Sequence, residues 1–244
     1  MQDDKLARYR LLVQERKNCI RCKDLGLTNP SQLQGGDFDA DEVGPWTRWN
    51  GDLQASLMLV GQEWVGLSAF KRQKGLDENT GTNKTLVNLF KSIGIPIHDA
   101  PLSAPNSGIF MTNAALCLKE GSNSAPVKSS WFRECGENFL KAQIELINPR
   151  VVVALGERAY ISIRDLFECP RVSFRQAVGA HQAIPLGSMQ SLVPVYHCSQ
   201  TVLNTHRPLD AQLEDWRLVG QELSRLCRTP NLNQNNLTQL SNSQ

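Results

Sequence analysis

The sequence lacks any long apolar run. No segment approaches the roughly 20 consecutive apolar residues that a membrane-spanning helix needs. Residues 1–19 are charged throughout and contain no apolar core, so they do not resemble a secretory signal. The 244 residues are 41% hydrophobic and 20% charged, which is ordinary for a soluble globular protein. We therefore expect a cytoplasmic, monomeric protein without a membrane partner.

Acidic residues are missing from one long stretch of the chain. Residues 169–209 contain three arginines, three histidines and no carboxylate, whereas residues 36–45 (GDFDADEVGP) are acidic. The net charge is only +2, which argues against a general polyanion binder. A local basic region in a nearly neutral protein favours a phosphate-facing surface. The alternative is a chance run in a region with few charges of either sign.

The chain also lacks the even cysteine count of a disulfide framework. It has seven cysteines, and disulfides are rare in cytoplasmic proteins. Cys19 and Cys22 form a C-x2-C pair, and Cys117 and Cys135 form a second, wider pair. Together the four thiolates could enclose zinc or an iron–sulfur cluster, and their spacing does not separate the two. The alternative is that Cys117 and Cys135 are ordinary buried residues.

Four short apolar segments predict buried strands, and helical patterns separate them. The segments are residues 57–60 (LMLV), 109–115 (IFMTNAA), 151–155 (VVVAL) and 192–196 (LVPVY). This order predicts one α/β domain over residues 1–228, a three-layer αβα sandwich with a central, mostly parallel four-stranded sheet. Pro194 predicts an edge position for the last strand. Residues 229–244 carry no charge, and we expect a disordered polar tail there.

Polar residues follow these strands at the point where each strand ends. Right-handed crossovers place the carboxyl ends of parallel strands on one edge of the sheet, where open α/β sheets bind ligands. The residues at these ends are Gln62, Glu63, Trp64, Asn113, Gly156 and the His197-Cys198-Ser199 run. We therefore expect a functional site at this edge. For each residue the alternative is a plain turn or a structural hydrogen bond.

These motifs, taken in order, resemble the uracil-DNA glycosylase superfamily over residues 19–223. The overall layout is most similar to its iron–sulfur (family 4-like) members. The matching features are the Cys19-x2-Cys22 pair, VGQEW at 60–64, TN-x3-C at 112–117, Cys135, INPRVVVALGERA at 147–159, and His197-Cys198-Ser199. The resemblance implies that Cys19, Cys22, Cys117 and Cys135 hold a [4Fe–4S] cluster away from the reaction centre, and it thus favours iron–sulfur over zinc.

The resemblance further implies a DNA repair glycosylase. Such an enzyme flips uracil or a related deaminated base out of single- or double-stranded DNA and hydrolyses its N-glycosidic bond. His197 would donate a hydrogen bond to the base oxygen on which negative charge grows. Asn113 would pair with N3–H and O4 of uracil. Glu63 would act as general base or electrostatic partner of the attacking water, helped by Gln62.

Base and DNA contacts are also implied. Gly61, Trp64 and Phe70 are the candidates for lining the base pocket, the two aromatic residues by stacking. The loop after His197 is expected to enter the minor groove and fill the gap left by the flipped base. Its candidate residues are Ser199, Val202 or Leu203 as an apolar wedge, and His206 and Arg207 on phosphates. The alternative is a plain loop that leads to the last helix.

The sequence departs from the family pattern at several positions. Trp64 and Cys198 each stand where proline is usual, and residues 77–84 (DENTGTNK) lack the family's stacking aromatic residue. Two other functions therefore stay open. One is a catalytically weakened nucleic-acid-binding protein of the same fold. The other is an α/β small-molecule-binding protein with a structural zinc site.

Overall fold

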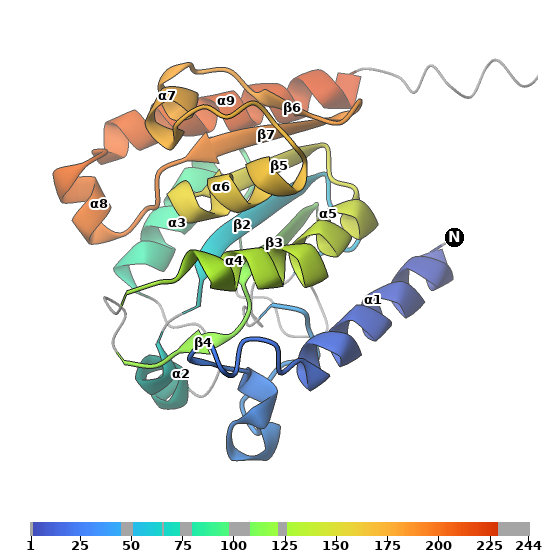
Figure 1. Ribbon diagram of the computed structural model, residues 1–244. Helices are drawn as coiled ribbons and strands as arrows, with labels where there is room; N and C mark the ends of the chain where they lie inside the picture. Colours follow the sequence, from blue (N-terminus) through green and yellow to red (C-terminus); the bar gives the residue numbers. More distant parts are fainter. Residues whose placement is uncertain are drawn as a thin grey trace, which may run out of the picture.

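A five-stranded sheet in the order β3-β2-β5-β7-β6 forms the centre of the molecule (Figure 1). The computed structural model describes residues 2–44, 51–64, 66–73, 80–97, 108–121 and 126–228. The five strands are β2 (Leu57–Glu63), β3 (Ile109–Ala115), β5 (Val151–Leu155), β6 (Ile184–Leu186) and β7 (Gln190–Val195). A separate two-stranded sheet pairs β1 (Leu27–Thr28) with β4 (Leu118–Lys119).

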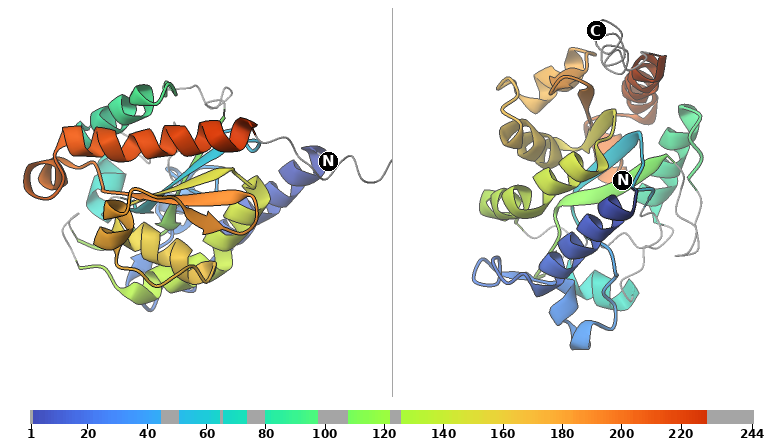
Figure 2. Two further views of the ribbon diagram at one scale, coloured as in Figure 1. Left: turned by 90° about the horizontal axis from the view of Figure 1, so that it is seen from above. Right: turned by 90° about the vertical axis from the view of Figure 1, so that its right-hand side faces the viewer.

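Helices cover both faces of the large sheet, as two views of the molecule show (Figure 2). The helices of the described residues are α1 (Gln2–Asn18), α2 (Leu67–Gln73), α3 (Gly81–Ser92), α4 (Ser129–Cys135), α5 (Lys141–Ile147), α6 (Glu157–Leu166), α7 (Phe174–Gly179), α8 (Gln200–Thr205) and α9 (Leu209–Arg228). Among them, α4, α5 and α6 pack on one face of the sheet, and α3 and α9 pack on the other. A π-helical turn, Gly136–Leu140, joins α4 to α5. The predicted αβα sandwich is therefore confirmed. None of the described helices is long and apolar enough to cross a membrane.

The four predicted strands run parallel, and a fifth strand joins them. Leu57 of β2 pairs with Ile109 on one side and with Val151 on the other, and β5 continues the parallel pairing to β7. The additional strand, β6, runs antiparallel to β7. The sequence does not predict this strand, because β6 has only three residues, one of them Pro185, and so short a segment shows no strand pattern.

The edge position predicted for the last strand from Pro194 is wrong, because β7 is an internal strand of the sheet. Pro194 itself, however, has no partner among the described strands on one side. β7 lies between β5 and β6. However, β6 pairs only with residues 190–192, so Pro194 lies beyond its end. The next residue, Val195, turns its carbonyl toward β5 and accepts a hydrogen bond from Gly156 N at 2.8 Å. Pro194 therefore faces the other way, where its missing N–H costs no bond in the ladder.

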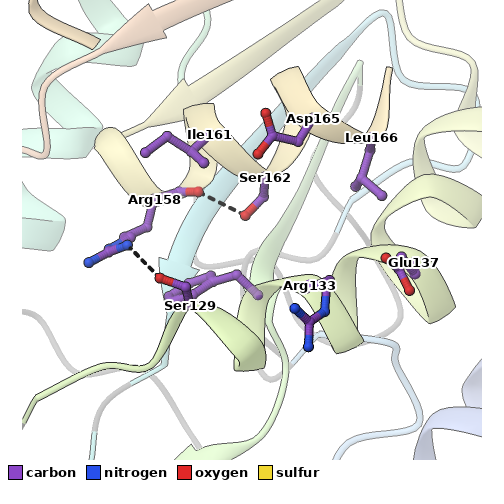
Figure 3. Close-up of a pocket in the computed structure, with 9 residues that line it drawn as sticks. Ser129, Arg133, Glu137, Arg158, Ile161, Ser162, Asp165 and Leu166 are labelled. Atoms are coloured by element: carbon purple, nitrogen blue, oxygen red, sulfur yellow. Dashed lines mark hydrogen bonds between the residues drawn. The ribbon is translucent and has the colours of Figure 1, made fainter. Parts of the chain in front are cut away.

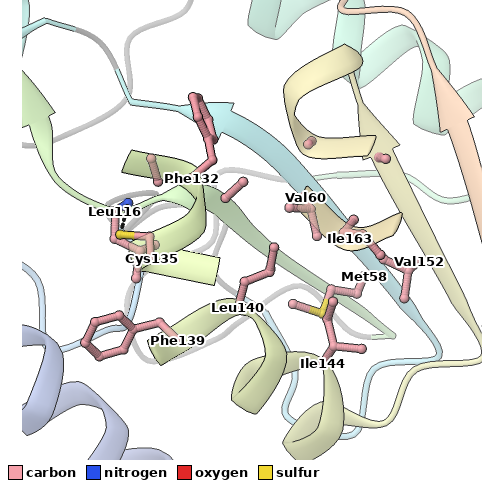
Figure 4. Packing of buried hydrophobic residues seen from close by; sticks show 14 of the residues in the cluster. Met58, Val60, Leu116, Phe132, Cys135, Phe139, Leu140, Ile144, Val152 and Ile163 are labelled. Carbon is pink, nitrogen blue, oxygen red and sulfur yellow. Dashed lines mark hydrogen bonds between the residues drawn. The ribbon is translucent and has the colours of Figure 1, made fainter. Parts of the chain in front are cut away.

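Alternating side chains of the strands build two apolar layers. On one face, Met58, Val60 and Val152 pack against α4, α5 and α6, with Ile144 and Ile163 among the helix residues (Figure 4). On the opposite face, a second set packs against α3 and α9; it includes Leu57, Leu59, Met111, Val153, Phe90 and Trp216. The rings of Phe90 and Trp216 meet there at 4.7 Å between centroids. These layers hold the strand ends, and thereby the predicted site, between the α4–α6 helices on one face and α3 and α9 on the other.

The segment between α1 and β2 is tied down where it is described. Arg16, which is 3% exposed, forms an ion pair with Asp39 at 2.6 Å and donates to the carbonyls of Ala40 and Glu42. Asn29 donates to the carbonyl of Cys19 at 2.9 Å. Much of the acidic stretch near residue 40 is therefore bound to the C-terminal end of α1. The predicted tail at 229–244 lies outside the described residues.

Candidate active site and cysteine cluster

The carboxyl ends of the parallel strands converge as predicted. Gly61 of β2 stands in register with Asn113 of β3. Gln62 lies against Gly156, because a Cβ on this glycine would come within 3.2 Å of Gln62 Nε2. Gly156 has φ of 96°, a conformation that favours glycine, and its N–H bonds the end of β7 just before His197. Sequence segments far apart therefore meet at one edge.

Asn113 is the most unusual polar residue of this edge. It is 1% exposed, and within the described part of the chain neither its Oδ1 nor its Nδ2 has a hydrogen-bond partner. A buried amide without partners is costly, and native proteins rarely keep one without a reason. Strand alternation places Asn113 on the same face as Met111, the face that carries α3. The two amide atoms could pair with a ligand that offers one donor and one acceptor, and this role stays a prediction.

His197 is held in one tautomer. Its Nδ1 accepts a hydrogen bond from the N–H of Ser199 at 3.1 Å, so the proton of the neutral ring is on Nε2. Burial lowers the pKa of His197, which favours that neutral ring. The result is an uncharged imidazole that offers one N–H donor at the end of β7.

Cys198 fastens the same segment to α3. Its side chain is fully buried, and Sγ donates to the carbonyl of Thr82 in the first turn of α3 at 3.6 Å. Burial raises the pKa of the Cys198 thiol to about 12, so it stays protonated as a donor. Cys198 thus fills the family's usual proline position with a buried contact to a neighbouring helix.

Glu63 has a partner that sequence reasoning missed. Its Oε1 lies 3.0 Å from Nζ of Lys119 on β4, and the two side chains are 17% and 3% exposed. Leu59 of β2 belongs to the layer that faces α3 and α9, so alternation places Glu63 on the same face as Asn113. The only sequence signal for Lys119 was a lysine directly after the apolar LCL run. The ion pair fixes the carboxylate at this edge.

The two candidate stacking residues lie in a small apolar cluster of their own. Trp64 and Phe70 are 4% and 1% exposed and pack with Leu33 and Leu118. The short helix α2 turns Phe70 back toward Trp64, which follows β2 directly. Both rings are therefore covered by protein here, and stacking on a flipped base stays a prediction.

The segment after His197 is a short helix rather than a plain loop. Ser199 precedes α8, which contains Val202 and Leu203, both partly buried. His206 is exposed. Arg207 is not free: Nε and Nη2 bind the carboxylate of Asp215 on α9 at 3.0 and 2.5 Å. Contacts of this segment with DNA stay a prediction.

The four predicted metal ligands meet around one cavity. Cys19 follows α1, Cys22 lies in the next turn, Cys117 follows β3, and Cys135 ends α4; all four line the cavity together with Arg16 and Phe139. Hydrogen bonds join Cys135 to Cys117 and to Cys22. The bond to Cys117 chiefly raises the pKa of Cys135, to about 12. The bond to Cys135 likewise raises the pKa of Cys22 far above its ordinary value.

The cysteine cavity fits the implied cluster in its chemistry. It brings together four soft thiols from three segments of the chain, and four thiols are the donor set of iron–sulfur clusters and of many structural zinc sites. The N–H of Leu116 also points at Cys135 Sγ from 3.4 Å, a contact of the type that tunes bound clusters (Figure 4). Within the described ranges, however, no three His, Cys, Asp or Glu side chains are grouped so that they could hold a metal ion. Cluster binding therefore stays a prediction.

A surface pocket of about 350 Å³ opens between α4 and α6 (Figure 3). Arg158 donates to Ser129 across it at 3.2 Å. Its walls carry charges of both signs, from Arg133 and Arg158 and from Glu137 and Asp165. None of the predicted site residues lines it, so it is separate from the strand-end site.

Comparison with known proteins agrees with the geometry. The model of the uracil DNA glycosylase superfamily matches residues 49–218, which include every strand of the large sheet. The first cysteine pair lies before the matched residues. The chain is also similar to a type-5 uracil-DNA glycosylase from Pyrobaculum aerophilum. The two are 25% identical over 206 residues, which cover 78% of this chain and 82% of that relative.

Proposed function

This chain belongs to the uracil DNA glycosylase superfamily, and on that premise we propose that it hydrolyses the N-glycosidic bond of uracil in DNA. The observation that carries the proposal is Asn113, whose buried amide lacks partners within the described part of the chain. Its Nδ2 can donate to O4 of uracil, while its Oδ1 accepts from N3–H. Cytosine presents the opposite pattern at these positions, so the same amide would reject it.

The reaction also requires that the departing base be stabilised. Bond cleavage leaves negative charge on the pyrimidine, and a positioned donor lowers the barrier by stabilising this charge. Nε2–H of His197 is such a donor, because the Ser199 N–H occupies Nδ1. A neutral imidazole holds the base oxygen by a hydrogen bond and keeps its proton as the base departs.

Water attack completes the reaction. A water oxygen bonds to C1′ of the sugar, the C1′–N1 bond breaks, and the base leaves with the electron pair. Glu63 would accept the water's proton or stabilise the positive sugar, and its ion pair with Lys119 holds it in place. Gln62, packed against Gly156, would help to orient the water. The products are free uracil and an abasic site.

A [4Fe–4S] cluster on Cys19, Cys22, Cys117 and Cys135 is part of the proposal. When bound, it would supply a covalent tie among the segments that carry these cysteines. These segments adjoin the sheet on the side of α4, and no cysteine of the set is placed in the reaction. Iron and sulfide content, together with brown colour, would distinguish this cluster from zinc whether or not the protein excises uracil.

The substrate would be DNA that contains uracil or another deaminated base, as a single or double strand, bound by a cytoplasmic monomer. The test incubates purified protein with oligonucleotides that carry uracil, hypoxanthine, xanthine or cytosine, followed by alkaline cleavage of abasic sites. We expect excision of uracil and none of cytosine. Binding to uracil-containing DNA without any abasic product would instead indicate a non-catalytic binding protein.

The role of Asn113 has its own prediction. Asn113→Ala should slow uracil excision by about 10²–10³-fold, since it removes one of the preorganised contacts to the base. Its folding stability should be equal or higher, because the variant also removes an unsatisfied buried amide. Single-turnover rates and urea unfolding measure the two effects. If Asn113→Ala excises uracil at the wild-type rate, the base-reading assignment is wrong.

A further inference from the structure

The segment from His197 to Arg207 leaves the sheet at β7 and returns to the molecule at α9. One side chain holds both of its ends. Gln212 of α9 is 1% exposed, and its Nε2 donates to the carbonyls of His197 and Arg207, each at 3.2 Å. A single buried side-chain amide thus binds both ends of this segment.

A second contact lies one turn further along α9. Asp215 is 3% exposed and binds Arg207 through two parallel hydrogen bonds of 3.0 and 2.5 Å. The guanidinium also lies over the ring of Tyr196, 5.8 Å from its centroid. A bidentate pair of this kind fixes orientation as well as distance. Gln212 and Asp215 are three residues apart on a helix and therefore share one face.

We propose that these contacts form a clamp that positions the His197–Arg207 segment for entry into duplex DNA. We call Gln212, Asp215 and Arg207 the α9 clamp. Gln212 and Asp215 are positioning residues, and Arg207 is a strut of the clamp and not a phosphate contact. The inference rests on the proposed glycosylase function. This role of Arg207 differs from the phosphate contact that the family resemblance implies.

The clamp explains why the segment can act on a duplex. An apolar side chain can displace a paired base only if the segment that carries it keeps its position. A segment that is fixed at both ends also loses little conformational freedom when it binds DNA. A single-stranded substrate needs no such displacement, because its base is already unpaired. Loss of the clamp should therefore affect duplex DNA more than single strands.

Excision rates test this difference. Asp215→Asn and Arg207→Gln should each slow single-turnover excision from duplex DNA by up to about 10²-fold, the usual effect of small misplacement in a site. Excision from single strands should fall much less. The double variant should be no worse than either single variant, because both remove the same contact. Glu214→Gln is the matched control, since Glu214 is the exposed neighbour of Asp215 and pairs only at the surface with Arg217.

Salt dependence separates a strut from a phosphate contact. If Arg207 binds a phosphate, Arg207→Gln should lower the slope of log affinity against log salt by about one, while Asp215→Asn should not. The clamp predicts an unchanged slope for both variants. A lower slope for Arg207→Gln alone, or wild-type duplex excision by Asp215→Asn, would overturn the proposal.

Amide hydrogen exchange gives a readout that needs no activity. The clamp predicts faster exchange across residues 198–206 in Asp215→Asn than in Glu214→Gln, with the rest of the sheet unchanged. If Asp215→Asn does not fold, Gln212→Met serves instead, because it keeps the volume and removes the donor. Unchanged exchange in the folded variant refutes the clamp. Absence of uracil excision by wild-type protein refutes the proposed function and leaves the exchange result to decide on the clamp.

Discussion

At the scale of single residues, the site depends on how each polar atom is satisfied. Asn113 has unpaired amide atoms within the described part of the chain, whereas His197 has one ring nitrogen bound and the other left as donor. Cys198 is bonded to the first turn of α3. Glu63 is paired with Lys119. The unpaired amide is open to a ligand, as the proposed function requires, and the paired groups have fixed geometry.

His197 leads to a prediction about pH. Burial lowers its pKa in the folded protein below the ordinary value of 6.5. Below pH 6.5 the unfolded chain therefore binds more protons than the folded one, so this residue makes stability fall as pH decreases. Above that pH its contribution is constant. Replacing it with asparagine should remove this part of the pH dependence.

The measurement is the free energy of unfolding in urea at pH values on both sides of 6.5. The wild type should lose more stability on acidification than His197→Asn. Equal acid dependence in wild type and His197→Asn would contradict the assignment of a half-buried, neutral imidazole.

At the scale of elements, short segments join the cysteine region to the site. β1 and β4 pair Leu27 with Lys119, and Lys119 then reaches the end of β2. The same β4 follows Cys117 directly. The two-residue strand β4 thus links the cysteine cavity to Glu63, beside the direct pairing of Glu63 with Ala115 of β3.

This connection predicts the effect of Lys119→Met. The variant keeps much of the side-chain volume but leaves the carboxylate of Glu63 without this cation. We expect a loss of about 1.5–3 kcal/mol in stability, the usual range for a hydrogen bond to a charged group. Uracil excision should slow as well, to a degree similar to that in Glu63→Gln. Urea unfolding and single-turnover excision measure the two effects.

A double-mutant cycle completes this test. If the ion pair is the relevant contact, Lys119→Met and Glu63→Gln together should cost less than the sum of their separate effects. Arginine at position 119 should restore part of the activity, because it keeps the charge. Fully additive losses would show that Lys119 supports the site in another way.

At the scale of the whole molecule, the cysteine cavity joins segments that are distant in sequence. α1, the turn after it, the end of β3 and the end of α4 all contribute to it. A cluster bound there would lock these segments together, and its loss would be felt as a loss of folding stability.

Cys135→Ala should therefore lose bound iron and lower the unfolding temperature together. Cys169→Ala is the matched control, because Cys169 is also buried but is not among the residues that line the cavity. It should keep full iron content. The check is iron and sulfide analysis of both variants beside a thermal melt. Full iron content in Cys135→Ala would remove this residue from the proposed ligand set.

The sequence by itself determined the four parallel strands, their common edge and the four cysteines of one cavity. Buried strands must be continuously apolar, and parallel strands must end on the same side, so local patterns were sufficient there. The strand order, the antiparallel β6 and the internal position of β7 were decided only by the tertiary structure. A three-residue strand that contains a proline carries no periodic signal of its own.

The tertiary structure alone also decided which partners the site residues have. Glu63 and Lys119 are 56 positions apart, and no local pattern links them. Trp64 and Phe70 are predicted to stack on a base, which stays a prediction. In the structure both rings are buried and pack with Leu33 and Leu118, because α2 turns back over the end of β2. No pattern in the sequence sets Gln212 and Asp215 apart from the other polar residues of α9. They are buried because α9 packs its face on the returning segment, and that packing is a property of the whole fold.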